Sequence, residues 1–296
     1  MDTKNLASKI METVKHLLGD EYIVSTNKVT KNNGLILTGL TIGRKGYNIA
    51  STIYINGFFD LYNAGIPISA IADKIVRVYE ENAVSQQFDI SFIDDFNATR
   101  NKIIFQLVNT ERNAALLESI PSVPFLDLSI IFKIYHYNNS LGAATTTITN
   151  KLMASWKVDT DTIYEAAMAN TPVLQEYTLC SMSDVLAELM PEIDIQGTIA
   201  DIDMFVLTNK EKFCGCGCIL YPHVLDDFAC KVMDTDFFIL PSSRHETILT
   251  SALKKDADML RQMVKEINAT NVSQEDFLSD YIYYYSKETK KITMIQ

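Results

Sequence analysis

The sequence predicts an α+β protein in which mixed, mainly antiparallel sheets are covered by packed helices. Three observations predict this fold class. Stretches rich in Ile, Val, Thr and Tyr are broken by Asn-Gly and Gly turn signals, as in antiparallel hairpins. Stretches with apolar residues at helical spacing follow them. The order of two strands, a short helix and a longer helix occurs twice, so we expect two or three similar strand-strand-helix modules.

The N-terminal part begins with an amphipathic helix, because apolar residues recur at helical spacing from Leu6 to Leu18. The next stretch favours two or three antiparallel strands, with turns at Gly34 and Gly46. A short helix follows these strands and ends at Gly65-Ile66-Pro67. We expect the longer helix to span about Ile68 to Asn82, with its apolar residues on one face.

The same order recurs in the middle of the chain. After Asp127 the strand-like run LSIIFKIYHY leads through a turn around 138–142 to AATTTITNK, the short helix LMASWKV and the helix TDTIYEAAMAN. Between the two copies, residues 91–101 have a helical pattern, and the alternation from Ile103 to Leu107 is typical of a partly buried strand. Residue identity between the copies is slight, so the pattern fits either shared topology or duplication.

The C-terminal part combines helices with strands that lack a clear period. A helix is expected from Ser183, as N-cap, to Met190, before Pro191. The run from Cys214 to Cys218 is predicted as one strand of a hairpin, PHVLDDFACKV as a helix that crosses it, and FFIL and TILT as a strand-loop-strand. A final helix, about Lys255 to Asn268, precedes a last hairpin. We divide the predicted elements into three modules, at residues 1–112, 113–198 and 199–296.

Composition and charge limit the class of partner. The formal charge of −11 works against nucleic acid, because phosphate binding needs clustered Lys and Arg, which are scattered here. No apolar run reaches the roughly 20 residues that a membrane-spanning helix needs. Charges interrupt the N-terminal helix, unlike a signal peptide, so we expect a cytoplasmic protein with reduced cysteines. The sequence has no Walker A and no G-x-G-x-x-G motif, and no cofactor is expected.

A run of alternating cysteines is a weak candidate for a metal site. Cys214, Cys216 and Cys218 would share one face of a strand, and His223, or alternatively Cys230, could complete four ligands. Same-face neighbours on a strand are about 6.6 to 6.8 Å apart, too far for one ion without a bend. The alternative is that the cysteines pack as small apolar side chains beneath the following helix, and we expect no bound metal.

A polar loop between two strand-like runs is the candidate catalytic site. Ser242, Ser243, His245 and Glu246 could supply a nucleophile and a base. The zinc-binding H-E-x-x-H motif is incomplete, because Leu249 stands at the second histidine position, and no G-x-S-x-G elbow surrounds the serines. In the competing interpretation, the hydroxyls and the imidazole satisfy backbone groups of their own loop.

Six segments along the chain carry a resemblance to a known family. They are KNNGLILTGLTI, STIYINGFFDLYNAG, QLVNTERNAALLESIPSVPFLDLSIIFKI, IYEAAMANTP, MFVLTNKEKFCGCGCILYPHVLDDFACKV and FFILPSSRHETIL. The chain resembles an uncharacterised protein family of gut Firmicutes, related to a broader bacterial family of unknown function. The resemblance implies no activity. Cys216, Cys218 and Arg244 stand where the family more often has small or aliphatic residues, which argues against thiol chemistry as the family's purpose.

Two functions remain open from the sequence, and whether the protein is an enzyme is undecided. The first is a non-enzymatic binding or protein-interaction module with a protein partner. The alternative is a hydrolase that uses the loop Ser242 to Glu246. An enzyme needs these side chains to converge in a cleft, whereas a binding module would tie His245 into its own loop.

Overall fold

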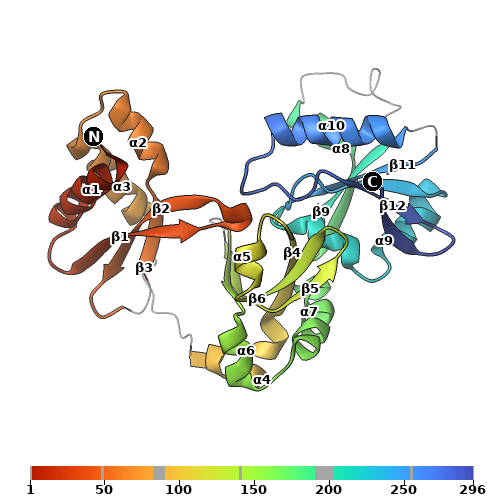
Figure 1. The fold of residues 1–296 in the computed structure, drawn as a ribbon, viewed down its shortest axis with the longest axis horizontal. Coiled ribbons are helices and arrows are strands. Elements are labelled where there is room, and N and C mark those ends of the chain that lie inside the picture. The colour runs from red at the N-terminus through yellow and green to blue at the C-terminus, as the bar shows by residue number, and fades with distance from the viewer. Residues whose placement is uncertain are drawn as a thin grey trace. The chain divides into compact units, whose positions relative to one another are not determined.

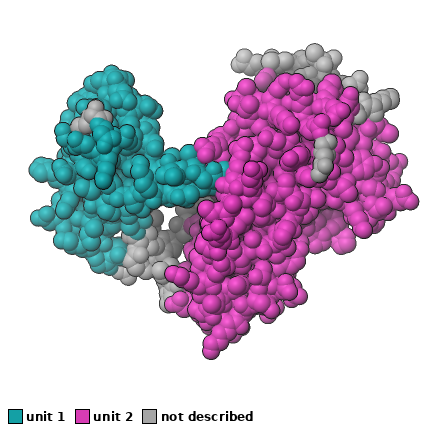
Figure 2. Space-filling model, in the orientation of Figure 1, with its two compact units in different colours: residues 1–91 teal, residues 92–296 magenta. Residues whose placement is uncertain are grey.

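The computed structural model describes residues 2–47, 50–82, 91–139, 142–190, 203–253 and 256–295. It forms two compact units, Met1–Ser91 and Phe92–Gln296 (Figure 2). We describe each unit by itself. The division into three modules, with boundaries after residues 112 and 198, stays a prediction.

The first unit is a three-stranded antiparallel sheet that packs against helices (Figure 1). Its elements are α1 (Thr3–Leu18), β1 (Tyr22–Thr30), a 3-10 turn (Asn32–Gly34), β2 (Ile36–Arg44), β3 (Ala50–Tyr54), α2 (Asn56–Asn63) and α3 (Ile68–Asn82). The strand order is β1-β2-β3. Ile10 of α1 and Ile75 of α3 are fully buried in one core with Leu40 of the central strand. The spacing of apolar residues in both helices therefore places one stripe of each against the sheet.

The second unit begins with a four-stranded sheet. Its elements are a 3-10 turn (Ser91–Asp94), α4 (Phe96–Thr99), a second 3-10 turn (Arg100–Lys102), β4 (Ile103–Asn109), α5 (Ala114–Leu117), β5 (Ser122–Phe125), β6 (Leu128–Asn139), β7 (Gly142–Thr147), α6 (Asn150–Trp156) and α7 (Thr160–Leu174). The long strand β6 pairs with β4 along one edge and with β5 and β7 along the other, always antiparallel. All seven residues of β4 are buried, so this strand lies in the interior.

A six-stranded antiparallel sheet completes the second unit. Its elements are β8 (Tyr177–Ser181), α8 (Met182–Leu189), β9 (Met204–Asn209), a 3-10 helix (Gly215–Leu220), α9 (Val224–Phe228), a π-helical turn (Ala229–Met233), β10 (Phe237–Leu240), β11 (Thr247–Ser251), α10 (Ala257–Thr270), β12 (Ile282–Ser286) and β13 (Lys291–Ile295). The strand order is β13-β12-β10-β11-β9-β8. Helix α10 lies over this sheet (Figure 1) and buries Leu260 and Val264 against Phe238.

The two sheets of the second unit share one core. Phe105 and Phe132 of the four-stranded sheet belong to the same buried cluster as Phe237, Ile239 and Tyr283 of the six-stranded sheet. Alternate residues of β10 point to opposite faces, so Phe237 and Ile239 enter this core while Phe238 and Leu240 face α10. Strand β10 is therefore buried on both faces of the six-stranded sheet.

A partly buried carboxylate joins the two sheets. Asp127, at the turn before β6, accepts hydrogen bonds from the hydroxyls of Tyr283, at 2.5 Å, and Ser279, at 2.7 Å. Nearby, the Asn109 amide donates to the carbonyl of Leu278 at 2.9 Å. These contacts fix the segment between α10 and β12 against the four-stranded sheet.

The two units differ in charge. Residues 1–91 contain nine basic and nine acidic side chains, so the formal charge of −11 falls on residues 92–296. We therefore expect the second unit, which carries this negative charge, to attract cationic groups over long range. In the part of the chain that the structure describes, no helix is long and apolar enough to cross a bilayer.

The structure confirms the predicted α+β class with mainly antiparallel sheets. It also confirms the long helix Ile68–Asn82, the strands FFIL and TILT, and the final hairpin of β12 and β13. The order of two strands, a short helix and a long helix appears as β2-β3-α2-α3 and again as β6-β7-α6-α7. Duplication as the origin of the two copies stays a hypothesis, beside shared topology alone.

Two local predictions are wrong. The run from Cys214 to Cys218 is not a strand: Cys214 has a left-handed φ of 54°, and a 3-10 helix starts at the next residue. Helix α8 is capped two residues earlier than predicted, by the hydroxyl of Ser181, which accepts from the Asp184 N–H at 3.1 Å. The final helix is confirmed; it spans Ala257–Thr270 and is capped by the Asp256 side chain. Pro191 and Lys255 lie outside the described residues.

Candidate functional site

His245 lies in the predicted loop between β10 and β11, and both of its ring nitrogens have partners inside the protein. Its Nδ1 accepts the backbone N–H of Cys214 at 3.3 Å, and its Nε2 lies 2.9 Å from Oδ1 of Asp276. Because Nδ1 acts as an acceptor, Nε2 carries the proton and donates to the carboxylate. The side chain is only 23% exposed. The imidazole is therefore held in one tautomer by a backbone group and an acid.

Asp276 is the acidic partner that the sequence does not reveal. Besides His245, it contacts Nε of Arg244 at 3.0 Å and accepts the hydroxyl of Ser273 at 2.8 Å. Burial opposes the charged form, but the hydrogen bonds from Ser273 and His245 and the charge of Arg244 together hold the pKa of Asp276 below its ordinary value. The carboxylate is therefore ionised at neutral pH, where it pairs with Arg244.

The two serines of the loop do not approach the imidazole. The hydroxyl of Ser243 accepts the backbone N–H of His245 at 3.0 Å, which closes a tight turn. The carbonyl of Ser242 accepts the N–H of Leu278 at 3.0 Å. Across the described residues, no hydrogen bond joins the side chain of Ser242, Ser243 or Glu246 to the imidazole. A serine nucleophile activated by His245 would need such a contact.

The backbone of the loop is bonded to the cysteine-rich segment. The carbonyl of His245 accepts the N–H of Gly215 at 3.0 Å and the hydroxyl of Thr208 at 2.7 Å. The carbonyl of Arg244 accepts the N–H of Cys216 at 3.2 Å. The loop thus joins β9, the 3-10 helix and the segment around Asp276. We call residues 242–246 the clamp loop.

The three clustered cysteines are buried in the core of the second unit. Cys214 is 8% exposed, Cys216 1% and Cys218 0%. The hydroxyl of Thr247 donates to Sγ of Cys216 at 3.0 Å. Burial is the largest influence on both inner thiols, and it raises the pKa of Cys216 and of Cys218 to about 12. Neutral thiols in this setting act as packing groups.

The suggested fourth ligand, His223, lies on the surface. It starts α9 in a left-handed conformation, with φ of 67°, while the cysteines face the core. Within the described ranges, no group of three or more His, Cys, Asp or Glu side chains is arranged to hold a metal ion. The expectation of no bound metal stays a prediction, which zinc analysis of the untagged protein would test.

Burial also predicts which thiols react. Under native conditions at pH 8, we expect a disulfide reagent such as Ellman's to modify the exposed Cys180 and Cys230 quickly. The three buried cysteines should react only after unfolding, because their thiolates are strongly disfavoured. Absorbance at fixed times, with and without guanidinium chloride, measures both groups. Fast reaction of a third thiol in the native protein would contradict the burial of these three cysteines.

A pocket that sequence analysis missed lies beside the segment that the clamp loop holds. It has a volume of about 370 Å³ and is lined by residues from the turn after β4, the end of α10 and the connection to β12. The lining residues are Arg112, Lys265, Asn268, Ala269, Val272, Ser273, Gln274, Phe277 and Asp280. We call it the α10-end pocket. In the sequence these residues are scattered positions without a motif.

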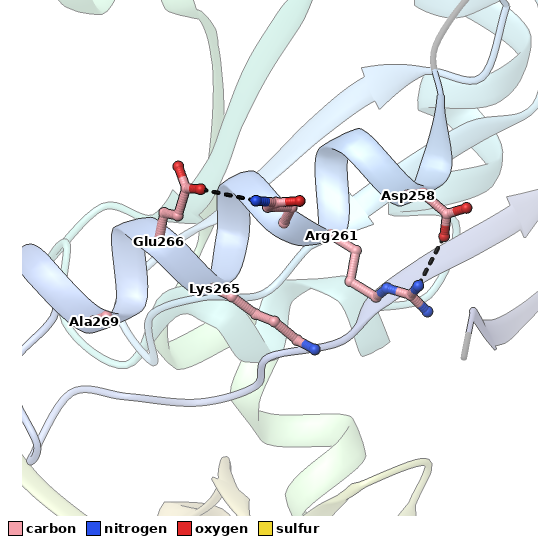
Figure 3. A pocket seen from close by; sticks show the side chains of 6 residues that line it. Asp258, Arg261, Lys265, Glu266 and Ala269 are labelled. Atoms are coloured by element: carbon pink, nitrogen blue, oxygen red, sulfur yellow. Dashed lines mark hydrogen bonds and ion pairs between the residues drawn. The ribbon is translucent and has the colours of Figure 1, made fainter.

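A second hollow runs along one flank of α10. It is about 480 Å³, and its described lining residues are Asp258, Arg261, Gln262, Lys265, Glu266 and Ala269. Figure 3 shows Arg261 and Lys265 extending from the same side of the helix. Arg261 pairs with Asp258 at 2.8 Å, whereas no ion pair joins Lys265 to any residue that the structure describes. Lys265 also lines the α10-end pocket.

The first unit has a separate pocket of about 410 Å³ between α1 and the edge of its sheet. It is lined by Asp2, Thr3, Lys4, Ala7, Ser8, Thr26, Asn27, Lys28 and Thr38. Lys28 donates to the hydroxyl of Thr38 at 2.8 Å, so one of its two lysines is already engaged. None of the three pockets is lined by a residue of the clamp loop.

One family model matches the chain over residues 3–287, nearly its whole length. The model is described as a family of unknown function, DUF5688. No curated protein and no solved structure matches the chain.

Proposed function

The chain belongs to this family of unknown function, and we propose that it is a non-enzymatic binding or protein-interaction module. In this proposal the clamp loop is a structural device rather than a catalytic site. It fixes the segment from Ser273 to Asp280, and other residues of this segment line the α10-end pocket. A cytoplasmic location is part of this proposal, and it is consistent with the finding that no described helix is long and apolar enough to cross a bilayer. The sequence resemblance supports an origin among gut Firmicutes.

One observation carries the proposal: both nitrogens of His245 are engaged within the protein. Nδ1 is occupied by the N–H of Cys214, and Nε2 donates to Asp276. A general base needs one nitrogen free to accept a proton from a nucleophile. Here the nitrogen that could accept is used to satisfy a backbone group. The arrangement therefore supports a structural role for His245.

The hydrolase alternative gives a different expectation for a conservative variant. In His245→Asn, the amide oxygen can still accept the N–H of Cys214, while the contact to Asp276 is lost. A structural role predicts a melting temperature lower by several degrees, in line with about 1–2 kcal/mol for a charge-assisted hydrogen bond. It also predicts no change in turnover of p-nitrophenyl acetate, p-nitrophenyl phosphate or a fluorogenic peptide mixture. Calorimetry and initial rates measure the two effects.

Ser243→Ala is the matched second variant. It removes the acceptor for the N–H of His245 but leaves the imidazole in place. Turnover by the native protein that disappears in both variants, while their melting temperatures stay near that of the native protein, would overturn the binding role in favour of a hydrolase. Loss of stability without any turnover that depends on His245 supports the proposal.

A further inference from the structure

We propose that the α10-end pocket binds a small zwitterion that carries both a carboxylate and an ammonium group, as a free α-amino acid does. The proposal rests on the binding role inferred above and specifies its ligand class. It follows from the charges that meet in this pocket: two cations, one carboxylate and the negative end of a helix. They come from three parts of the second unit: the turn after β4, helix α10 and the connection to β12.

The cationic part of the pocket is suited to a carboxylate. The guanidinium carbon of Arg112 lies 3.4 Å from the ring centroid of Phe277, a buried aromatic residue. A guanidinium that stacks by its face keeps its N–H groups, which lie in its plane, available for a bidentate contact. Lys265 adds a second positive charge. Neither cation forms an ion pair with any residue in the described ranges.

The remaining polar groups are suited to an ammonium. Asp280 receives one hydrogen bond at Oδ1, from the Asn268 amide at 2.8 Å, and no described residue donates to its Oδ2. The Oδ1 of Asn268 is enclosed and has no partner, although the residue is only 8% exposed. Asn268 lies in the last turn of α10, where the helix carries partial negative charge, and Asp280 lies in the connection just before β12. An ammonium group in the pocket would pair with the Asp280 carboxylate, whose Oδ2 has no described donor.

A ligand with only one kind of charge fits this pocket less well. A simple anion would meet Asp280 and the helix end, and a simple cation would meet Arg112 and Lys265. A zwitterion can place each charge near its opposite. The volume of about 370 Å³ is at the lower end of the roughly 300–1,000 Å³ typical of small-molecule sites, which favours a small ligand.

The pocket is also held in shape without a ligand. Asp276, within the lining segment, is fixed by His245 and Arg244. Ser279 is fixed by Asp127, and the Asn268 amide also donates to the carbonyl of Ser279 at 2.8 Å. A preorganised site loses less entropy when a ligand binds.

Isothermal titration calorimetry with four probes tests the ligand class. L-alanine and L-glutamine carry both charges, propionate carries only the carboxylate, and propylamine carries only the ammonium. We expect binding of at least one amino acid and binding at least about tenfold weaker, or none, for the two single-charge probes, because each loses one charged hydrogen bond. Propionate or propylamine binding as tightly as the amino acids would overturn the zwitterion.

Isosteric variants test the place of binding. Lys265→Gln removes one cation, and Asp280→Asn removes the carboxylate charge but can still accept from Asn268. Each is expected to weaken amino-acid binding about tenfold or more. Lys151→Gln, at an exposed position of α6, is the matched control and should bind as the native protein does. Equal melting temperatures of all three variants exclude unfolding as the cause.

The outcomes separate this proposal from the binding role itself. Failure of both amino acids to bind the native protein, or binding that survives both pocket variants, would overturn the pocket assignment. Neither result would touch the binding role, which only turnover that depends on His245 overturns.

Discussion

Replacing Gly215 with alanine is expected to lower the unfolding free energy of residues 92–296 by about 3 kcal/mol or more, at the upper end for overpacking a core. A Cβ at this position would lie 2.3 Å from the hydroxyl of Thr208, 2.6 Å from the backbone nitrogen of Asn209 and 2.7 Å from the carbonyl oxygen of His245. Two of these three atoms belong to the backbone and cannot rotate away. Strand β9 or the clamp loop must therefore move, which breaks the hydrogen bonds that join them.

Urea unfolding followed by tryptophan fluorescence measures this effect, because the single tryptophan, Trp156, lies in the second unit. Gly217→Ala is the matched control two residues away. Its Cβ would meet only the ring of Phe105, at 3.1 Å, and a ring edge can shift by a few tenths of an ångström. We expect the control to lose about 1 kcal/mol or less. Equal losses in the two variants would mean that the clamp loop does not approach Gly215 as closely as described.

Replacing Asp127 with alanine is the second change with a large expected effect, a loss of about 2–4 kcal/mol of unfolding free energy. The hydroxyls of Tyr283 and Ser279, both fully buried, would lose their acceptor. Burial, and then the charge of Asp127, raise the pKa of Tyr283, so its hydroxyl stays protonated and needs a partner. An unpaired buried donor costs more than the hydrogen bond itself contributes.

A double-mutant cycle separates the hydrogen bond from other effects of the Asp127 change. Tyr283→Phe removes the tyrosine hydroxyl, and the double variant removes both partners. We expect the double variant to lose less stability than the sum of the two single variants, because the unpaired hydroxyl is gone. Strict additivity in urea unfolding would show that the two side chains do not interact.

The fold class could be predicted because local signals agree with the tertiary structure. The segment Ile68–Asn82 has apolar residues at a clear helical period and a proline just before it. The structure has a helix with these bounds. The strands FFIL and TILT are short apolar runs bounded by turn residues. In each case the information lies within about fifteen neighbouring residues, as helix and strand signals generally do.

The cysteine run could not be predicted in the same way. Alternation of Cys and Gly is compatible with a strand, but Cys214 adopts a left-handed conformation. That conformation is supported by the imidazole of His245, which accepts the Cys214 N–H, and by the carbonyl of His245, which accepts the Gly215 N–H. Both partners are distant in sequence. Their proximity is a result of folding, so no local pattern contains it.

The candidate site shows the same limit. The sequence pattern points to His245 and the serines but does not locate an acid. Asp276 becomes the partner of His245 only when α10 and β12 are in place. The α10-end pocket is even harder to predict from the sequence. Arg112 and Lys265 are isolated basic residues in the sequence, and only the packing of α10 beside the turn after β4 brings them together.

The segment from Ser273 to Asp280 is shared by two sets of contacts, and this sharing makes them thermodynamically coupled. Asp276 belongs to the clamp loop's network, while Phe277 and Asp280 line the pocket. A ligand that orders this segment would stabilise the contacts of the clamp loop. An intact clamp loop would strengthen ligand binding by the same free energy. Ligand binding should therefore slow amide hydrogen exchange at Arg244, whose N–H donates to the carbonyl of Asp276, outside the pocket itself.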